Sequence, residues 1–155
     1  MRIPGLSLNF ENLPGAVPAA RARVNIDEWQ EAARIVRESN RPLVALWGAD
    51  NRAVADCFAV SAAFSLESGL AVVELPIRAA SQDELPGYPD LSGMFPVAHR
   101  LQRAIFDLLG LRAEGASDNR PWLRHAAWPT GTYPLRKDFD TNQKFDNPQE
   151  NYPFV

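Results

Sequence analysis

Apolar positions recur along residues 95–115 in alternating steps of four and three, the spacing of one face of an α-helix. They are Val97, Leu101, Ala104, Leu108 and Leu111. Arg103 and Asp107 fall on the other side, four residues apart and close enough to pair. Phe106 and Leu109 widen the apolar surface, so this central helix is expected to pack against more than one neighbour.

Both ends of a second helix, over residues 24–38, carry recognisable signals. Asn25 can cap the helix, and Glu28, three residues later, completes a capping box. The Asn-Arg-Pro sequence at residues 40–42 stops it. Its expected buried face consists of Ile26, Trp29, Ala33 and Val36. At the end of the central helix, Gly110 stands where a left-handed C-cap is expected.

Short apolar runs between these helices predict strands. Residues 43–47 read as a buried strand, and residues 57–64 and 70–77 as a hairpin with one aromatic face. Pro76 cannot donate to a strand ladder, which places the end of the second hairpin strand near a sheet edge. The predicted fold is α+β, with a small, mostly antiparallel sheet of three to four strands packed against helices and an extended C-terminal tail.

The pattern divides the chain into three parts. Residues 1–23 are expected to form an extended N-terminal arm, with one possible short strand at residues 6–10. Residues 24–112 form the α+β domain, within which residues 81–93 are a loop. Residues 113–155 contain no long periodic segment and predict an irregular tail that wraps around the domain.

Composition narrows the classes of function. The 155 residues carry a net charge of −3, which argues against general nucleic-acid binding. The single cysteine, Cys57, excludes an internal disulfide and a cysteine-built zinc or iron–sulfur site, and is typical of a reducing cytoplasm. No apolar run approaches the ~20 residues of a spanning helix, so direct membrane insertion is not expected.

No motif for a cofactor or a catalytic centre is apparent. His99 and His125 are the only histidines and do not occur in HxH or HExxH spacing. We interpret His99 as a solvated or partner-facing residue, His125 as a packing or capping residue, and Cys57 as a small core residue. We expect no catalytic residue, no metal ligand and no cofactor-binding residue in the chain.

The segment PLRKDF, residues 134–139, has two interpretations. Pro134 starts the loop, and Leu135 and Phe139 would fix it to the core. Its charged residues then either face water or form a docking surface, in which Arg136 makes bidentate contacts to a partner carboxylate. Arg103 and Asp107 could complete that surface, or pair with each other.

The central helix and PLRKDF together resemble the C subunit of NADH-quinone oxidoreductase (respiratory complex I). The resemblance rests on the order of an Arg-x-Ile-Phe-Asp-Leu-x-Gly helix, an ExG turn and the PLRKDF loop, and covers residues 27–139. The family includes the equivalent domain of membrane-bound [NiFe] hydrogenases. Residues 120–125 and Trp128-Pro129 look more like the hydrogenase-4 and formate hydrogenlyase branch.

Two departures from the family pattern indicate a divergent branch. The family helix usually carries Glu-Arg-Glu, where this chain has Gln102-Arg103-Ala104. The family's Gly-His-Pro turn appears as Gly115-Ala116-Ser117. Contacts that the family makes through those carboxylates and that imidazole are therefore not expected in this chain.

The resemblance implies a non-catalytic scaffold domain of a membrane-associated oxidoreductase complex. It would pack on a D-like or [NiFe] hydrogenase-like large subunit and other cytoplasmic-arm subunits, peripheral to the inner face of the cell membrane. The expected docking residues are Arg103, Asp107, Pro134, Leu135, Arg136, Lys137, Asp138 and Phe139. A free-standing adaptor or a small self-contained enzyme are the alternatives, and the electron donor (NADH, formate or hydrogen) and ion pumping stay open.

The last six residues, Glu-Asn-Tyr-Pro-Phe-Val, resemble the start of the large-subunit portion in fused hydrogenase-type proteins. We therefore consider two hypotheses: a junction to a large-subunit domain after residue 155, or an ordinary C-terminus.

Overall fold

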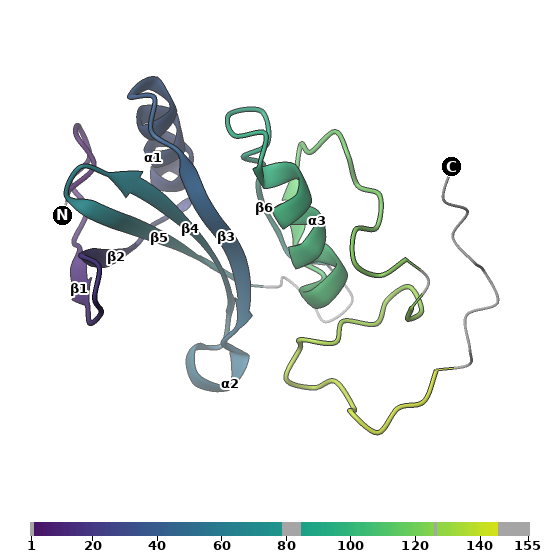
Figure 1. Cartoon of the computed structure of the whole chain (residues 1–155). Coiled ribbons are helices and arrows are strands. Elements are labelled where there is room, and N and C mark those ends of the chain that lie inside the picture. Colours follow the sequence, from purple (N-terminus) through teal and green to yellow (C-terminus); the bar gives the residue numbers. More distant parts are fainter. Residues whose placement is uncertain (1, 79–84, 126, 146–155) are drawn as a thin grey trace.

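Five strands and two long helices form the body of the protein, seen here in a computed structural model that describes residues 2–78, 85–125 and 127–145 (Figure 1). The elements follow in the order β1 (Glu11–Leu13), β2 (Ala19–Arg23), α1 (Ile26–Glu38), β3 (Leu43–Asp50), α2 (Arg52–Ala55), β4 (Phe58–Leu66), β5 (Gly69–Ile77), β6 (Gly87–Pro89), α3 (Ala98–Leu109) and β7 (Arg112–Glu114). The predicted α+β class is confirmed.

The main sheet has the strand order β1-β2-β5-β4-β3. All neighbours are antiparallel except β2 and β5, which are parallel. The prediction of a mostly antiparallel sheet is confirmed, but its three to four strands are too few. The additional strands come from residues 1–23, the predicted arm, which supplies β1 and β2 rather than the strand proposed at residues 6–10.

The predicted edge position of the second hairpin strand is wrong, because β5 lies at the centre of the sheet. The argument about Pro76 still holds locally. Leu70 N–H donates to Pro18 and Glu74 C=O accepts from Val24, so alternate residues of β5 point their backbone groups towards β2. Pro76 points the same way, beyond the last β2 partner, where no ladder bond is required.

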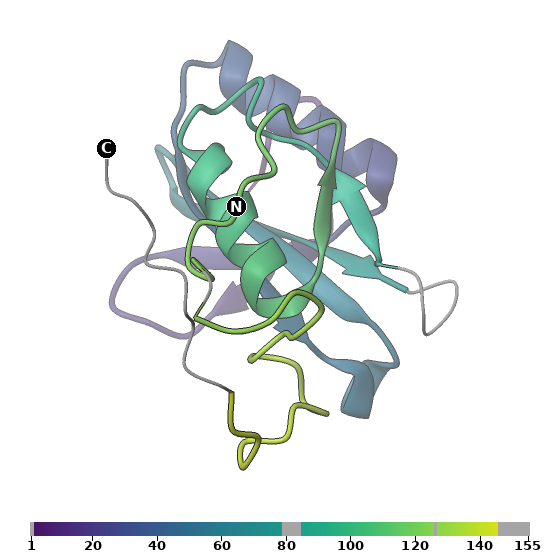
Figure 2. The same ribbon diagram turned by 90° about the vertical axis from the view of Figure 1, so that its right-hand side faces the viewer.

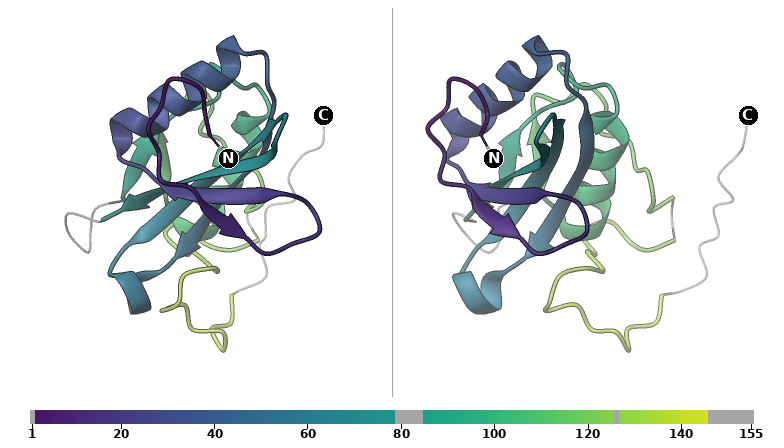
Figure 3. Two further views of the ribbon diagram at one scale, coloured as in Figure 1. Left: turned by 90° about the vertical axis from the view of Figure 1, so that its left-hand side faces the viewer. Right: turned by 60° about the vertical axis from the view of Figure 1, so that its left-hand side comes forward.

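One face of the sheet carries the core, and α1 and α3 both cover this face (Figure 3). Its inward side chains on β4 are the predicted aromatic face, Phe58, Val60, Ala62 and Phe64. Cys57, at the start of this hairpin, is buried as predicted. Burial of this continuous apolar face is the main force that holds the layers together.

The capping box predicted for α1 is present. Glu28 N–H donates to Asn25 Oδ1 over 2.9 Å, and Asn25 N–H donates to Glu28 Oε2 over 2.9 Å. Trp29 is buried and its indole N–H donates to the Pro89 carbonyl, so α1 also holds the β6 segment. Ile26, the first residue of α1, was predicted to be buried but is 57% exposed.

The central helix α3 turns only part of its predicted apolar face to the core: Leu111 is buried as predicted, while Leu101 and Leu108 are partly buried against the core. The helical residues on the buried side are Ala98, Gln102, Ile105 and Leu109, whereas Val97 is 53% exposed. Gly48 of β3 explains the choice: a Cβ there would lie 2.6 Å from Leu109 Cδ1 and 3.2 Å from Ile105 Cγ2. The glycine lets this side of α3 approach the sheet closely.

Gln102 shows what one departure from the family pattern does. Its side chain is buried; Oε1 accepts from Leu91 N–H over 2.8 Å and Nε2 donates to Asp90 Oδ1 over 2.6 Å. A carboxylate in this place would lack the donor that satisfies Asp90.

The residues predicted as a loop from 81 to 93 also include β6, which pairs in parallel with β7.

The described part of the tail, residues 113–125 and 127–145, runs along the side of α3 that faces away from the sheet (Figures 1 and 2). The Tyr-Pro-Phe segment near residue 155 lies outside the described residues.

Candidate docking surface

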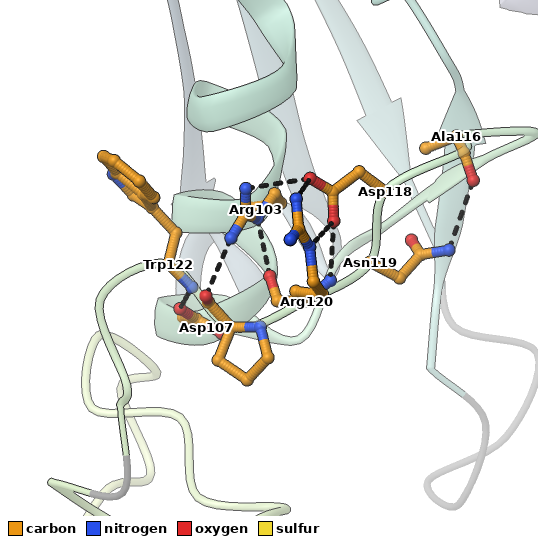
Figure 4. A network of polar contacts seen from close by, with 8 residues as sticks. Arg103, Asp107, Ala116, Asp118, Asn119, Arg120 and Trp122 are labelled. Atoms are coloured by element: carbon orange, nitrogen blue, oxygen red, sulfur yellow. Dashed lines mark hydrogen bonds and ion pairs between the residues drawn. The ribbon is translucent and has the colours of Figure 1, made fainter. Parts of the chain in front are cut away.

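Arg103 of α3 binds the tail. Nε donates to the Arg120 carbonyl over 2.6 Å, Nη2 donates to the Pro121 carbonyl over 2.9 Å, and Nη1 meets Asp118 Oδ2 at 3.0 Å (Figure 4). The side chain is only 13% exposed. The guanidinium of Arg103 therefore makes its hydrogen bonds within the chain, so Arg103 is not a free docking residue.

Asp107 fixes the next turn of the tail. It is 3% exposed, and its Oδ2 accepts from three consecutive backbone N–H groups, those of Trp122, Leu123 and Arg124, over 2.7, 2.6 and 3.0 Å. Successive N–H groups that converge in this way form a concave anion site, here filled by the protein's own carboxylate. Arg103 and Asp107 thus hold consecutive parts of the tail against α3, Arg103 at residues 118–121 and Asp107 at residues 122–124.

Asp118 completes this network on the tail side. It accepts from the side chain and the backbone N–H of Arg120 as well as from Arg103. The Arg120 hydrogen bonds, side chain first, hold the pKa of the Asp118 carboxyl well below its ordinary value. The turn of the tail beside Arg103 therefore keeps its charge pairing across the physiological pH range.

Arg136 of the PLRKDF loop closes the end of α3. Its Nε donates to the Leu109 carbonyl over 2.8 Å, one of the carbonyls that a helix C-terminus leaves unpaired. The guanidinium lies over the rings of Tyr133 and Phe58, with its central carbon 4.3 and 5.2 Å from the ring centroids. Burial lowers the pKa of Arg136 from its ordinary value. Arg136 is thus turned inward, contrary to the expected outward docking role.

Two residues near the end of β3 hold the rest of the loop; we call Asp50 and Arg52 the clasp. Asp50 Oδ2 accepts from Lys137 N–H over 2.8 Å, and Arg52 binds Asp138 through Nη2 over 2.9 Å. Arg52 also binds Asp50, through Nη2 over 2.6 Å and Nε over 2.9 Å. The side-chain hydrogen bonds of Arg52 are the main cause that lowers the pKa of Asp50 to about 2.

The loop is therefore fixed by its charged residues, whereas the sequence prediction assigned this role to its apolar ones. Leu135 is 56% exposed, and Phe139 is half-buried with its ring against Phe145, 6.4 Å between centroids. Pro134 is half-buried, and Lys137 is exposed. Within the described ranges no carboxylate partners the Lys137 ammonium.

A second apolar stripe on α3 continues into this loop. It consists of Val97, Leu101, Ala104 and Leu108, four of the five residues in the periodic apolar face; the fifth, Leu111, is buried. Leu101 and Leu108 are only partly buried, and Leu135 N–H donates to the Leu108 carbonyl over 3.0 Å. We define the docking surface as Val97, Leu101, Leu108, Leu135 and Lys137.

Sequence reasoning missed Asp50, Arg52 and Phe58 as partners of the loop. Asp50 and Lys137 are separated by 87 positions, and the turn after β3 carries no motif that predicts such a contact. Only the Asp50-x-Arg52 spacing, which places both side chains beside one turn, gave a local signal.

Gly110, at the end of α3, lets Tyr133 and Arg136 of the tail pack closely against the helix. Replacing Gly110 tests this contact. Its φ of +72° is left-handed, and a Cβ would lie 2.7 Å from both Arg136 Nη2 and Tyr133 Cζ. We expect Gly110→Ala to lower the free energy of unfolding by about 1–2 kcal/mol, because strain and the clash add. Urea unfolding measures this, with Gly131→Ala as control, since Gly131 also has positive φ but no atom within 4 Å of its Cβ position. Equal losses for the two variants would contradict a contact role for Gly110.

The described residues offer neither a metal site nor a membrane-spanning helix. No group of three or more His, Cys, Asp or Glu side chains there could hold a metal ion. None of the helices described is both long and apolar enough to cross a membrane. Of the two histidines, His99 is half-buried at the start of α3 and His125 is exposed with a positive φ of 32°.

Comparison with known proteins identifies the family. Residues 22–145 match the family described as "Respiratory-chain NADH dehydrogenase, 30 Kd subunit", which covers most of the chain. The chain belongs to this family. The resemblance found in the sequence is thereby confirmed, over a range that includes both the central helix and PLRKDF.

The relatives of this 30 Kd subunit family member include hydrogenase subunits. Subunit beta of the membrane-bound hydrogenase of Pyrococcus furiosus is 36% identical over 66 residues, 43% of this chain and 38% of that protein. Formate hydrogenlyase subunit 5 of Escherichia coli is 32% identical over 62% of this chain and 17% of that protein. Hydrogenase-4 component G of Escherichia coli is 30% identical over 73% and 21%. The chain thus spans between about a sixth and two fifths of these relatives.

The fold is shared with a solved structure, that of the membrane-bound sulfane sulfur reductase, an archaeal respiratory membrane complex. The TM-score is 0.65 at 23% identity, and the match covers 93% of this chain and 91% of that one.

Proposed function

We propose that this chain is a non-catalytic docking domain of a membrane-associated oxidoreductase complex, of the complex I-like NADH dehydrogenase type or the [NiFe] hydrogenase type. Its partner would be the large subunit of that complex. Membership of the NADH dehydrogenase 30 Kd subunit family supports this proposal, as do the hydrogenase subunits among its relatives. In such an assembly the domain would be peripheral to the membrane, on its cytoplasmic side.

The observation that carries the proposal is the docking surface itself. Val97 and Leu135 are 53% and 56% exposed, and they lie at the two ends of an apolar stripe along α3. The loop at its end is fixed by Arg136 at the C-terminus of α3 and by the clasp. An apolar stripe that is held rigid before binding loses little conformational entropy when a partner covers it. Exposed apolar surface beside a charged rim is typical of protein interfaces.

Replacing Leu135 by Asp together with Lys137 by Glu tests the proposal. We expect the double variant to bind the large subunit at least about tenfold more weakly, because it places two negative charges on an apolar, cationic contact. The measurement is co-purification of the complex from cells that produce both chains, followed by titration of the purified components. The circular dichroism of the variant should stay that of the wild type, since both side chains are exposed.

Val54→Asp is the matched control, because Val54 is 87% exposed and lies on α2, outside the docking surface. Arg136→Glu is unsuitable as a docking test, since it would also uncap α3. Wild-type binding by the double variant would rule out docking through this surface.

A further inference from the structure

The edge of the main sheet at β3 has backbone groups that face away from the rest of the protein. β3 is the last strand of the sheet and pairs only with β4. Asn51 N–H donates to the Cys57 carbonyl, so Ala49 and Trp47, at steps of two, also point their backbone groups towards β4. By the same alternation, Leu46 and Gly48 point theirs outward. No hydrogen bond to these outward groups is found among the described residues.

This edge lacks the usual protection against pairing with another strand. Natural edge strands are commonly blocked by lysine, by proline or by a bulge in the strand. The sequence of β3, LVALWGAD, has no basic residue and no proline, and its one irregularity lies between Leu43 and Ala45, at the start. From Ala45 to Asp50 the register with β4 is regular. Six residues of regular edge are long enough to accept a strand.

The surroundings of the edge indicate the side chains of such a strand. Val44 and Trp47 of β3 are 53% and 41% exposed. α3 lies beside β3 (Figure 1) and approaches Gly48 closely through Ile105 and Leu109. The helix positions of Leu101 and Leu108, about a quarter-turn from that contact and only partly buried, leave the stripe for a strand at this edge to cover. A strand added here would lay alternate side chains against that stripe, and those side chains are therefore apolar.

Charge determines which kind of strand suits the Asp50 end. The exposed Lys137 lies there, next to Arg52. Arg52 is already paired with Asp50 and Asp138, so Lys137 is the cation left to be matched here. If two copies paired symmetrically about Trp47, the Asp50 end of one would meet the residues before Leu43 of the other, where Arg41 is bound to Glu67, so the second copy would bring no free carboxylate to Lys137. A segment with a carboxylate at this position is complementary where a second copy is not.

We propose that the β3 edge accepts an extended segment of the large subunit as a sixth strand of the sheet. The segment is apolar on the side of α3 and carries an Asp or Glu beside Lys137. Backbone hydrogen bonds would supply affinity, and the stripe and Lys137 would supply register. This inference rests on the proposed function, because it specifies how the same partner is held.

Hydrogen exchange read residue by residue tests the added strand. In the isolated chain the amides of Leu46 and Gly48 should exchange fast, while those of Ala45, Trp47 and Ala49 are protected by β4. In the purified complex with the large subunit, Leu46 and Gly48 should become protected by at least about tenfold. A complex that forms while both amides stay fast would overturn the added strand and leave the proposed function standing. Protection of both amides already in the isolated chain would also overturn it, by assigning the edge to a second copy or to the chain itself.

Val44→Lys provides a second test. Val44 lies at the irregularity next to Ala45, at the end of the regular edge, and a lysine there opposes addition of a strand along that edge. We expect it to weaken binding of the large subunit by about tenfold. Val17→Lys, at a valine of similar exposure (57%) beside the opposite edge of the sheet, should bind as the wild type. Wild-type affinity for Val44→Lys would contradict the inference. If wild-type chain and large subunit form no complex at all, the proposed function fails instead.

Discussion

Replacing Asp107 by alanine is expected to lower the free energy of unfolding by about 3 kcal/mol and to release the tail from α3. The carboxylate is buried, and one of its oxygens accepts from the N–H groups of Trp122, Leu123 and Arg124. Each hydrogen bond to a charged group contributes about 1.5–3 kcal/mol. Without the carboxylate, the tail can move into water, where the three N–H groups are hydrogen-bonded again. The net loss of stability is therefore smaller than the sum of the three hydrogen-bond energies.

Asp107→Asn separates charge from shape. The amide oxygen can still accept, so we expect a loss of about half that of alanine. Urea unfolding gives the free energies, and hydrogen exchange of the amides of residues 122–124 reports the tail directly. Unchanged protection of these amides in Asp107→Ala would show that Asp107 does not hold the tail.

Local patterns predicted the elements of the fold well. The capping box at Asn25 and Glu28, the hairpin of β4 and β5, and the left-handed cap at Gly110 all depend on residues close in sequence. Such signals are visible in a single chain, because their partners lie within a few positions. The strands β1 and β2 were missed because β1 is only three residues long and β2, AARAR, lacks the β-branched and aromatic residues typical of strands.

The rotation of α3 shows where periodicity reaches its limit. The helix carries two apolar sides, and spacing alone does not rank them. Gly48, 57 positions before Ile105, lets Ile105 and Leu109 reach the sheet. The hydrogen bonds that satisfy buried Gln102 stabilise the same orientation of the helix. The other apolar side of α3 stays partly exposed and is the one that we propose as the docking surface.

The PLRKDF loop was predicted as a docking element, but its residues divide differently from that prediction. Arg136 and Asp138 act within the chain, while Leu135 and Lys137 face outward. The reason is that α3 leaves a carbonyl unpaired at Leu109 and the clasp offers a buried carboxylate, both of which attract the loop's donors. Gly110, Arg136 and Asp50 therefore make the end of α3, the loop and β3 one rigid support for the exposed residues.

Acid is expected to release this support through Asp50. Its pKa falls from an ordinary 3.8 to about 2 in the folded chain, so its contribution to stability is complete above pH ~4 and is lost as the pH falls towards ~2. The shift corresponds to a stabilisation on the order of 2 kcal/mol. We therefore expect Asp50→Asn to lower the free energy of unfolding by about 2 kcal/mol near pH 6, with the difference from wild type shrinking below pH ~4. Asp138→Asn, which alters a 64% exposed partner of the same Arg52, should cost less than about 1 kcal/mol. Urea unfolding of the three proteins between pH 2 and 7 measures both effects. A difference between wild type and Asp50→Asn that stays constant down to pH 2 would show that the ionised Asp50 carboxylate does not hold the loop.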